Sequence, residues 1–377
     1  MNKNLRNLAL SVITAASLAS CSTDFELNAP YDDVPIVYGL LDQSTDTNWI
    51  KINKTFAGTG NNVDYAAIND SSMYDNLSGV VEEWIAGVNT KTYNVQEMWV
   101  QDIEAGIFYT DSQKVYFIDT MTQGGLNSDA TYKLIVDVSE TGKTVEAETA
   151  LVSSFGFSTQ FTNMVAPGVN FAYSNSSSSN NYPTLTPTWQ SATYGKRYEF
   201  ALHFFYKEHI DNGIDTTVTM QEIVWNLGSQ EAITADGGES MDQPISGDAF
   251  YSMVQSRLDG YAYEADVIKR IPDRLEFRLT VAGEDLHTYM EVNEPATGIV
   301  TDRPSYTNVA GGTGIFSSRY TTELMRIGSW PLLKKIKFNF NSTKELCEGQ
   351  YTSGFKFCTD SADGGAGIWS NSTFHCN

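Results

Sequence analysis

The sequence has few basic residues, histidines and cysteines for a chain of 377 residues. Lys and Arg together number 24 against 46 Asp and Glu, which gives a formal net charge of −22 at pH 7. A chain with this charge repels nucleic acid phosphates and anionic lipid headgroups, so neither is an expected partner. Long apolar runs are also scarce. Beyond the start of the chain, no stretch reaches the length that a membrane-spanning helix needs.

Motifs that carry chemistry are missing as well. The chain has neither a Gly-x-Ser-x-Gly nucleophile elbow nor a His-Glu-x-x-His zinc helix. Its 4 histidines are scattered and predict no metal cluster. They are His203, His209, His287 and His375. Acid-rich turns at residues 211–215 and 360–365 leave weak calcium binding open, although residues 211–215 break the EF-hand spacing. The sequence therefore predicts no catalytic residue, no bound cofactor and no metal site.

The start of the chain carries a leader. Lys3 and Arg6 precede an apolar run over residues 8–18, and small residues then lead into Cys21. Cations followed by a short apolar segment and small residues are typical of a secretory signal. The segment resembles the bacterial lipoprotein box, in which Leu, Ala and Ser precede a cysteine that receives a diacylglyceride. This resemblance implies that residues 1–20 are a cleaved lipoprotein signal peptide and that Cys21 is the lipid anchor.

Lipidation at Cys21 would attach a very acidic body to a membrane. Cleavage brings the formal charge from −22 to −24, because residues 1–20 hold two basic residues and no acidic one. Diacylation and a further acyl chain make the attachment durable, since each buried methylene contributes about 0.8 kcal/mol. The alternative is an ordinary cleaved signal peptide with an unmodified cysteine.

The residues behind the anchor indicate which way the protein faces. They are Ser22, Thr23, Asp24, Phe25 and Glu26. This stretch resembles the short acidic export signal with which Bacteroidota send a lipoprotein to the outer face of the outer membrane. The alternative explanation is a simple polar tether over residues 21–34, because flexible tethers are commonly acidic.

Three further cysteines are candidates for a disulfide near the end of the chain. They are Cys347, Cys358 and Cys376. In an oxidising compartment they permit one disulfide in any of three pairings and leave one thiol over. A Cys3His zinc site that includes His375 is the less favoured alternative.

Short segments rich in β-branched and aromatic residues predict a mainly β protein. Residues 35–152 predict an N-terminal immunoglobulin-like β-sandwich. In its last strand pair, Tyr132 would tie its hydroxyl back to nearby backbone. A larger β-rich domain with one or two short helices is expected over residues 153–345, followed by a Cys-containing C-terminal tail over residues 346–377.

Periodicity predicts several individual elements. Residues 93–100 predict one strand, and residues 198–206 alternate between an apolar core face and a polar face. Apolar residues at helical spacing predict a helix near residues 247–259, which Ser246 would cap. The glycines of residues 311–316 predict a turn packed against strands rather than a phosphate cradle, because no Lys-Ser or Lys-Thr follows them.

These segments together carry a family resemblance. Cys21, residues 37–42 and 50–54, the strand at residues 198–208 and the turn at residues 311–316 resemble an uncharacterised family of Bacteroidota surface lipoproteins. The resemblance covers most of the chain after the leader. Members of this family often accompany outer-membrane TonB-dependent transporters. Their shared motifs are structural, so the resemblance implies a location and a kind of partner but no catalytic residue.

The expected function is that of a non-enzymatic lipoprotein, lipid-anchored in the outer membrane and facing the cell exterior. It would act as an accessory or scaffold subunit of an outer-membrane β-barrel complex, either a transporter or an assembly or secretion machine, alongside other surface lipoproteins. The alternative is a surface glycan- or substrate-binding lipoprotein, which requires an exposed row of two or three Trp or Tyr rings on one face. An enzyme would require a cleft with carboxylates of separated acidity.

Overall fold

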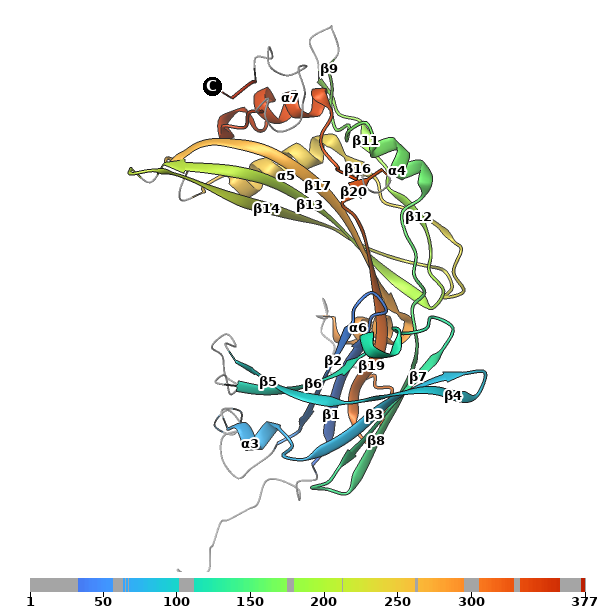
Figure 1. Cartoon of the computed structure of the whole chain (residues 1–377). Helices are drawn as coiled ribbons and strands as arrows, with labels where there is room; N and C mark the ends of the chain where they lie inside the picture. The colour runs from blue at the N-terminus through green and yellow to red at the C-terminus, as the bar shows by residue number, and fades with distance from the viewer. Residues whose placement is uncertain are drawn as a thin grey trace, which may run out of the picture.

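The chain folds into two lobes that together have the outline of a crescent (Figure 1). The computed structural model describes residues 33–56, 64, 66, 68–101, 112–174, 180–211, 213–261, 264–294, 305–328, 333–359 and 374–376. Each lobe has its own hydrophobic core. Among the described residues, no helix combines the length and the apolar composition that crossing a bilayer requires.

The lower lobe is a β-sandwich. One of its sheets has the strand order β18-β8-β7-β3-β4, and the other is the half of an 8-stranded sheet with the order β19-β1-β2-β6-β5. The strands are β1 (Pro35–Leu41), β2 (Thr47–Lys54), β3 (Leu77–Ile85), β4 (Val88–Asn94), β5 (Gln96–Gln101), β6 (Ser112–Asp119), β7 (Thr131–Val138), β8 (Lys143–Ala150), β18 (Val309–Ala310) and β19 (Thr313–Leu324). Two short helical segments, α3 (Asn69–Ser72) and η1 (Met121–Gln123), lie in the connections.

Alternating residues of both sheets fill the sandwich core. Val37 and Ile50 come from one sheet and Val81 and Leu134 from the other, and each is at most 1% exposed. The predicted tyrosine tie is present, because the Tyr132 hydroxyl accepts a hydrogen bond from the Asn127 amide at 2.7 Å. The mainly β fold with an N-terminal sandwich is therefore confirmed.

The upper lobe is built on three long strands. They are β13 (Gly195–Asp211), β14 (Thr216–Glu231) and β17 (Val267–Gly283). The predicted alternation is confirmed on β13, where Tyr198, Phe200, Leu202, Phe204 and Tyr206 are all buried in the core. The core face of this sheet is covered by α4 (Thr159–Val165), α5 (Gly247–Leu258) and α7 (Phe340–Glu348) (Figure 1).

Short elements complete the upper lobe. The two-stranded pairs are β9 (Tyr173–Ser174) with β10 (Asn180–Asn181), β11 (Thr184–Leu185) with β16 (Ile245–Ser246), β12 (Thr188–Gln190) with β15 (Ser240–Asp242), and β20 (Arg326–Ile327) with β21 (Lys334–Lys335). A 3-10 turn, η2 (Ser353–Phe355), follows α7. The predicted helix is confirmed as α5, and the Ser246 side chain caps it by accepting from the Ala249 amide.

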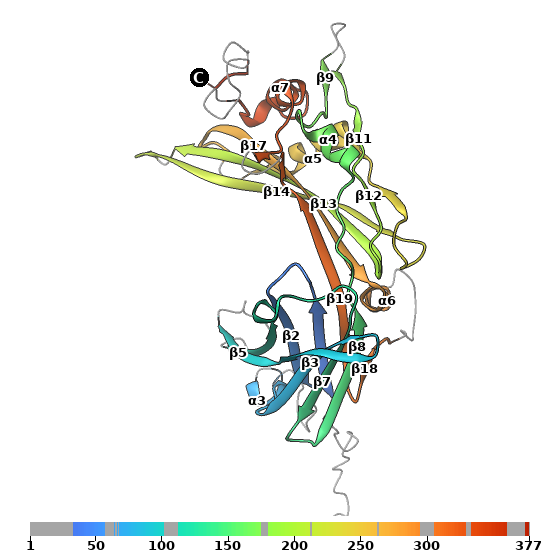
Figure 2. The same cartoon turned by 45° about the vertical axis from the view of Figure 1, so that its right-hand side comes forward.

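One strand joins the two lobes. The first half of β19 pairs in parallel with β1, and its second half pairs antiparallel with β17. The 8-stranded sheet therefore runs without interruption from β14 in the upper lobe to β5 in the lower lobe. It lines the concave side of the crescent, and α6 (Glu284–Asn293) lies where the two halves meet (Figures 1 and 2).

This topology corrects the predicted domain boundaries. Strands β18 and β19 lie within residues 153–345, yet they pair with β8 and β1 and complete the lower sandwich. The glycine turn between them is packed against strands as predicted, because a Cβ on Gly314 would collide with the Val37 carbonyl oxygen. The described residues between 346 and 376 are not a separate tail either, since Leu346 and Phe374 belong to the upper core.

The single strand predicted over residues 93–100 is also wrong. The chain makes two strands there, and β4 pairs with β3 in one sheet while β5 pairs with β6 in the other. Val95 is the link between them, and its amide donates to the Gly79 carbonyl at 2.9 Å. Because the chain passes from one sheet to the other at a single residue, residues 93–100 all have strand-like sequence. The sequence pattern therefore could not show that the segment is divided between two sheets.

Candidate functional site

A groove of about 780 Å³ opens on the concave side of the lower lobe, beside α6. Strands β1, β2 and β19 form its floor, and α6 forms one wall. Most of the lining is apolar. Its aromatic and aliphatic lining residues include Tyr38, Trp49, Leu286, Tyr289, Met290 and Ile315. Its volume is within the usual range of sites that bind small molecules or short segments, about 300–1,000 Å³.

The strand alternation sends two aromatic rings into this groove. On β1, Tyr38 points outward while Val37 and Gly39 face the sandwich core, where a Cβ on Gly39 would press on the Phe316 ring. On β2, Trp49 points outward while Ile50 faces inward. Tyr38 is 44% exposed and Trp49 is 48% exposed. Exposed aromatic side chains on the outer face of a sandwich indicate a binding surface.

Helix α6 supplies the third ring. Tyr289 meets Tyr38 edge to face, with ring centroids 6.2 Å apart and the ring planes at 74°. The Tyr289 hydroxyl donates to the Tyr38 hydroxyl at 3.4 Å. Burial, followed by this hydrogen bond, raises the pKa of Tyr289 to about 12. Tyr289 therefore presents a neutral hydroxyl to the groove at physiological pH.

Paired polar groups form the rim. Arg319 Nε lies 3.7 Å from Asp42 Oδ2, and the Asp42 carboxylate also accepts from the Ser44 amide at 2.9 Å. Lys51 Nζ donates to Gln113 Oε1 at 3.1 Å. Among the described lining residues there is no His, Cys, Ser or Glu, and Asp42 is the single carboxylate. This composition suits binding, and the described lining holds no pair of carboxylates.

Charged and polar side chains lie on the concave face of the upper lobe. The face of β13 and β17 that points away from the core carries charged pairs and polar side chains. Arg278 Nε lies 2.6 Å from Glu323 Oε1, and the Arg274 guanidinium lies over the Phe205 ring at 3.7 Å.

The disulfide candidates resolve into one bond and one thiol. Cys358 and Cys376 are joined, while Cys347 on α7 is free and buried. Burial raises the pKa of the Cys347 thiol well above its usual range. A Cys3His zinc site with His375 is therefore wrong, because two of its three thiolates are used in the disulfide.

The other predicted site residues lie either outside the described residues or in the hairpin turn at residues 211–215. Cys21 and the export stretch, Ser22, Thr23, Asp24, Phe25 and Glu26, lie outside the described residues, as do residues 360–365. In the turn at residues 211–215, Asp211 Oδ1 accepts from the Gly213 amide at 2.8 Å, which is an ordinary hairpin contact.

Sequence reasoning missed the groove, although a signal was available. Trp49 alternates with Ile50 along its strand, so the same period that buries Ile50 places Trp49 outside. Tyr289 could not be assigned to the same site, because it is 251 positions from Tyr38 in the sequence. Only the pairing of β19 with β1 and β17 brings α6 beside β1.

Sequence comparisons give no further guidance. No protein-family model matches the chain, and no curated protein matches its sequence. The resemblance to Bacteroidota surface lipoproteins accordingly stays a prediction.

Proposed function

We propose that the chain is a lipid-anchored, outward-facing protein of the outer membrane that acts as an accessory or scaffold subunit of a β-barrel complex. In this proposal the groove beside α6 holds an apolar segment of the partner. The observation that carries it is the exposed aromatic floor of the groove, made by Tyr38 and Trp49. The protein has no enzymatic role in this proposal.

The chemistry of the groove fits a protein segment. Leu286, Met290 and Ile315 provide aliphatic walls, and the rings of Tyr38 and Trp49 provide large contact areas at small entropic cost. Aromatic side chains in well-packed pockets are typical of the residues that contribute most of the binding energy at protein interfaces. Lipid anchoring at Cys21 would confine the chain near its partner and raise the effective concentration, so a small interface would be sufficient.

Glycan binding is the second candidate, and the row formed by Tyr289, Tyr38 and Trp49 favours it. Sugars stack on the face of an exposed ring and need hydrogen-bonding groups around it. Here Tyr289 meets Tyr38 edge to face rather than in one plane, and the walls beside them are aliphatic. The geometry therefore favours an apolar segment over a sugar.

Two tryptophans provide a matched test. Trp49 and Trp99 are each 48% exposed, but only Trp49 lines the groove. Trp99 lies on β5, which β6 separates from β2, and the Lys114 ammonium is 5.4 Å from the Trp99 ring centroid. The full chain with a C-terminal tag, purified in mild detergent from its native cells, should bring a β-barrel protein with it, identified by mass spectrometry. The Trp99→Ala variant should retain this partner and the Trp49→Ala variant should lose it.

The outcomes separate the candidates. Equal recovery of the barrel with both variants, or recovery of the protein alone, would contradict the scaffold proposal. Quenching of tryptophan fluorescence by oligosaccharides, if abolished by Trp49→Ala and not by Trp99→Ala, would establish the glycan-binding candidate instead.

A further inference from the structure

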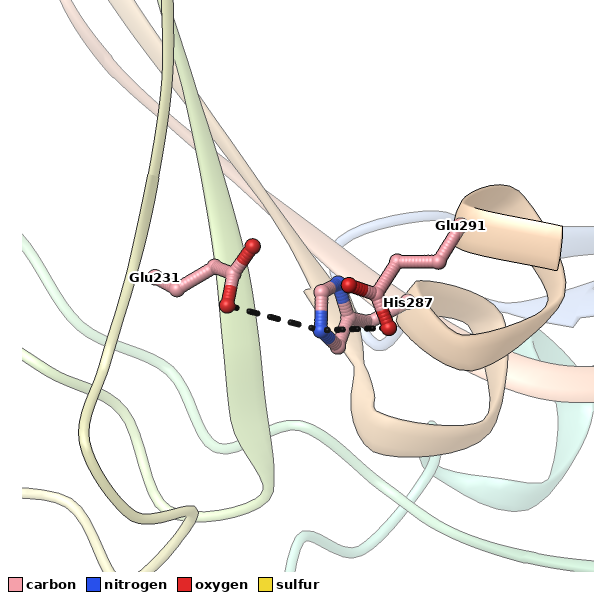
Figure 3. Close-up of side chains that lie close together, drawn as sticks. All are labelled: Glu231, His287 and Glu291. Carbon is pink, nitrogen blue, oxygen red and sulfur yellow. Dashed lines mark ion pairs between the residues drawn. The ribbon is translucent and has the colours of Figure 1, made fainter. Parts of the chain in front are cut away.

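A second cluster lies on the other side of α6 and involves residues that the groove does not use. His287 and Glu291 are one turn apart on α6, and Glu231 is the last residue of β14. Figure 3 shows the three side chains pointing toward one another from these two elements. One ligand atom from each residue lies within 4.8 Å of the other two.

The two distances from His287 are compatible with ligands around an ion. His287 Nε2 lies 3.5 Å from Glu291 Oε2 and 3.7 Å from Glu231 Oε2, which is longer than a hydrogen bond of about 2.7–3.2 Å. A tetrahedral Zn²⁺ with nitrogen and oxygen ligands at about 2.0–2.2 Å separates them by roughly 3.4 Å. The direct His–Glu pair elsewhere in the chain is much closer, since His203 Nδ1 lies 2.5 Å from Glu222 Oε1.

The burial of His287 is an independent indication. The residue is 5% exposed, and Nδ1 is buried without a hydrogen-bond partner among the described residues. Its other nitrogen, Nε2, faces two carboxylates at distances too long for a hydrogen bond. A buried polar ring without hydrogen bonds costs free energy. An ion bound at Nε2 would give that nitrogen a strong polar interaction, while Nδ1 would keep no partner among the described residues.

Among the described residues, no Lys or Arg pairs with Glu231 or Glu291, and the basic group that faces both carboxylates is His287. Arg197 is opposite Glu231 in the strand register, but its guanidinium pairs with Glu199 and Glu294 instead. Glu231 and Glu291 are about half exposed, so an ion can reach them from solvent.

We propose that Glu231, His287 and Glu291 bind a Zn²⁺ ion, with water as the fourth ligand. The imidazole favours zinc over calcium, which takes about 6–8 oxygen ligands. His287 and Glu291, at positions i and i+4, share one helix face, so α6 offers two ligands already in place. The third ligand comes from β14, and the bound ion therefore joins α6 to the long sheet of the upper lobe.

The site has a consequence for the groove, and this part of the inference depends on the proposed function. Tyr289 is located between His287 and Glu291 on α6 and forms part of the groove wall. An ion that fixes α6 against β14 would hold this wall in place. Zinc should then strengthen partner binding without touching the partner.

Titration with ZnCl₂ in a calorimeter tests the site on the full chain in mild detergent, after dialysis against a chelator. We expect one Zn²⁺ per chain, no comparable heat from CaCl₂, and a higher melting temperature with zinc. Glu231→Gln and Glu291→Gln should each weaken zinc binding by about tenfold or more. Both side chains are exposed, so these variants should fold even where a His287 variant does not.

Glu222→Gln is the matched control, because Glu222 also pairs with a histidine but leaves no room for an ion. It should bind zinc as the unchanged chain does. Absence of zinc binding, or binding that neither Glu231→Gln nor Glu291→Gln weakens, would overturn the site. Trp49→Ala should leave zinc binding intact, which separates failure of the zinc site from failure of the proposed function.

Discussion

Arg270 and Glu208 form an ion pair in which neither side chain has any exposure, with Nε 2.7 Å from Oε2. They face each other across β17 and β13. The same guanidinium donates to Glu264 Oε2 at 2.7 Å and to the Phe355 carbonyl at 2.9 Å. The Cys358 amide in turn donates to the Arg270 carbonyl at 2.9 Å. One buried arginine therefore connects two core strands with the C-terminal segment.

Removing this arginine should be among the most destabilising single changes in the upper lobe. Arg270→Met leaves Glu208 buried without its cation, and breaking a buried pair costs about 3–5 kcal/mol of the free energy of unfolding. Arg278→Gln is the control, because the Arg278–Glu323 pair is partly exposed and should contribute less than about 1 kcal/mol. Urea unfolding of both variants measures the difference. Equal losses would show that burial of the pair is unimportant.

The disulfide should stabilise the same region. Cys358 and Cys376 are 18 positions apart, and closing a loop of this length contributes about 3 kcal/mol. Replacing both with Ser should lower the free energy of unfolding by about that amount, and reduction of the unchanged chain should have the same effect.

Cys347 should resist a maleimide in the folded protein and react after denaturation, because it is buried. Rapid labelling of Cys347 in the folded chain would contradict the packing of α7.

The sequence predicts those features of the fold that depend on residues close together in the chain, and not those that depend on distant strand partners. The core face of β13 and the Ser246 cap of α5 were predictable, because both patterns are complete within a dozen residues. The change of sheet at Val95 was not, since both halves of that segment are strand-like and only their partners differ.

The sites depend on contacts that no local pattern contains. Glu231 and His287 are far apart in the sequence, and they meet only because α6 folds back beside the end of β14. The groove likewise requires β19 to return to β1 from the other lobe. Histidine spacing along the chain therefore predicted no metal cluster, although the fold brings three ligand-type residues together.

Acid should weaken the upper lobe through Asp273. Lys335 Nζ lies 2.9 Å from both carboxylate oxygens, and Arg274 Nη1 lies 2.9 Å from Oδ2. Burial would raise the pKa of Asp273, but hydrogen bonds from Lys335 and Arg274 outweigh it and lower the pKa below its usual value. A depressed folded-state pKa stabilises the protein above the unfolded-state value, roughly 4, and this stability is lost as the pH falls through the folded-state pKa.

The variant that tests this effect is Asp273→Asn. It should be less stable than the unchanged chain by about 2 kcal/mol at pH 7, a value typical of hydrogen bonds to charged groups. The difference should shrink below about pH 4, because the unchanged chain then loses the same contribution. Urea unfolding across this pH range measures it. Asp242→Asn, at an exposed position on β15, should show no such change, and a difference for Asp273→Asn that grows in acid would refute the argument.

Membrane attachment should depend on a single sulfur. Cys21→Ser removes the proposed acceptor of the lipid, and each buried methylene lost costs about 0.8 kcal/mol of membrane affinity. The variant should move to the soluble fraction after cell lysis. Cys347→Ser should remain with the membrane, because Cys347 lies in the upper core.

Orientation can be separated from attachment in the same cells. Replacing Asp24 and Glu26 with Ala should keep the protein in the membrane but protect it from protease added to intact cells, because the proposed acidic export signal is lost. Mass spectrometry of the mature N-terminus should find diacylglyceride on Cys21. Two results would contradict the proposed location of the groove beside a barrel at the cell surface. One is a mature chain that begins at another residue. The other is an unchanged protein that added protease cannot reach on intact cells.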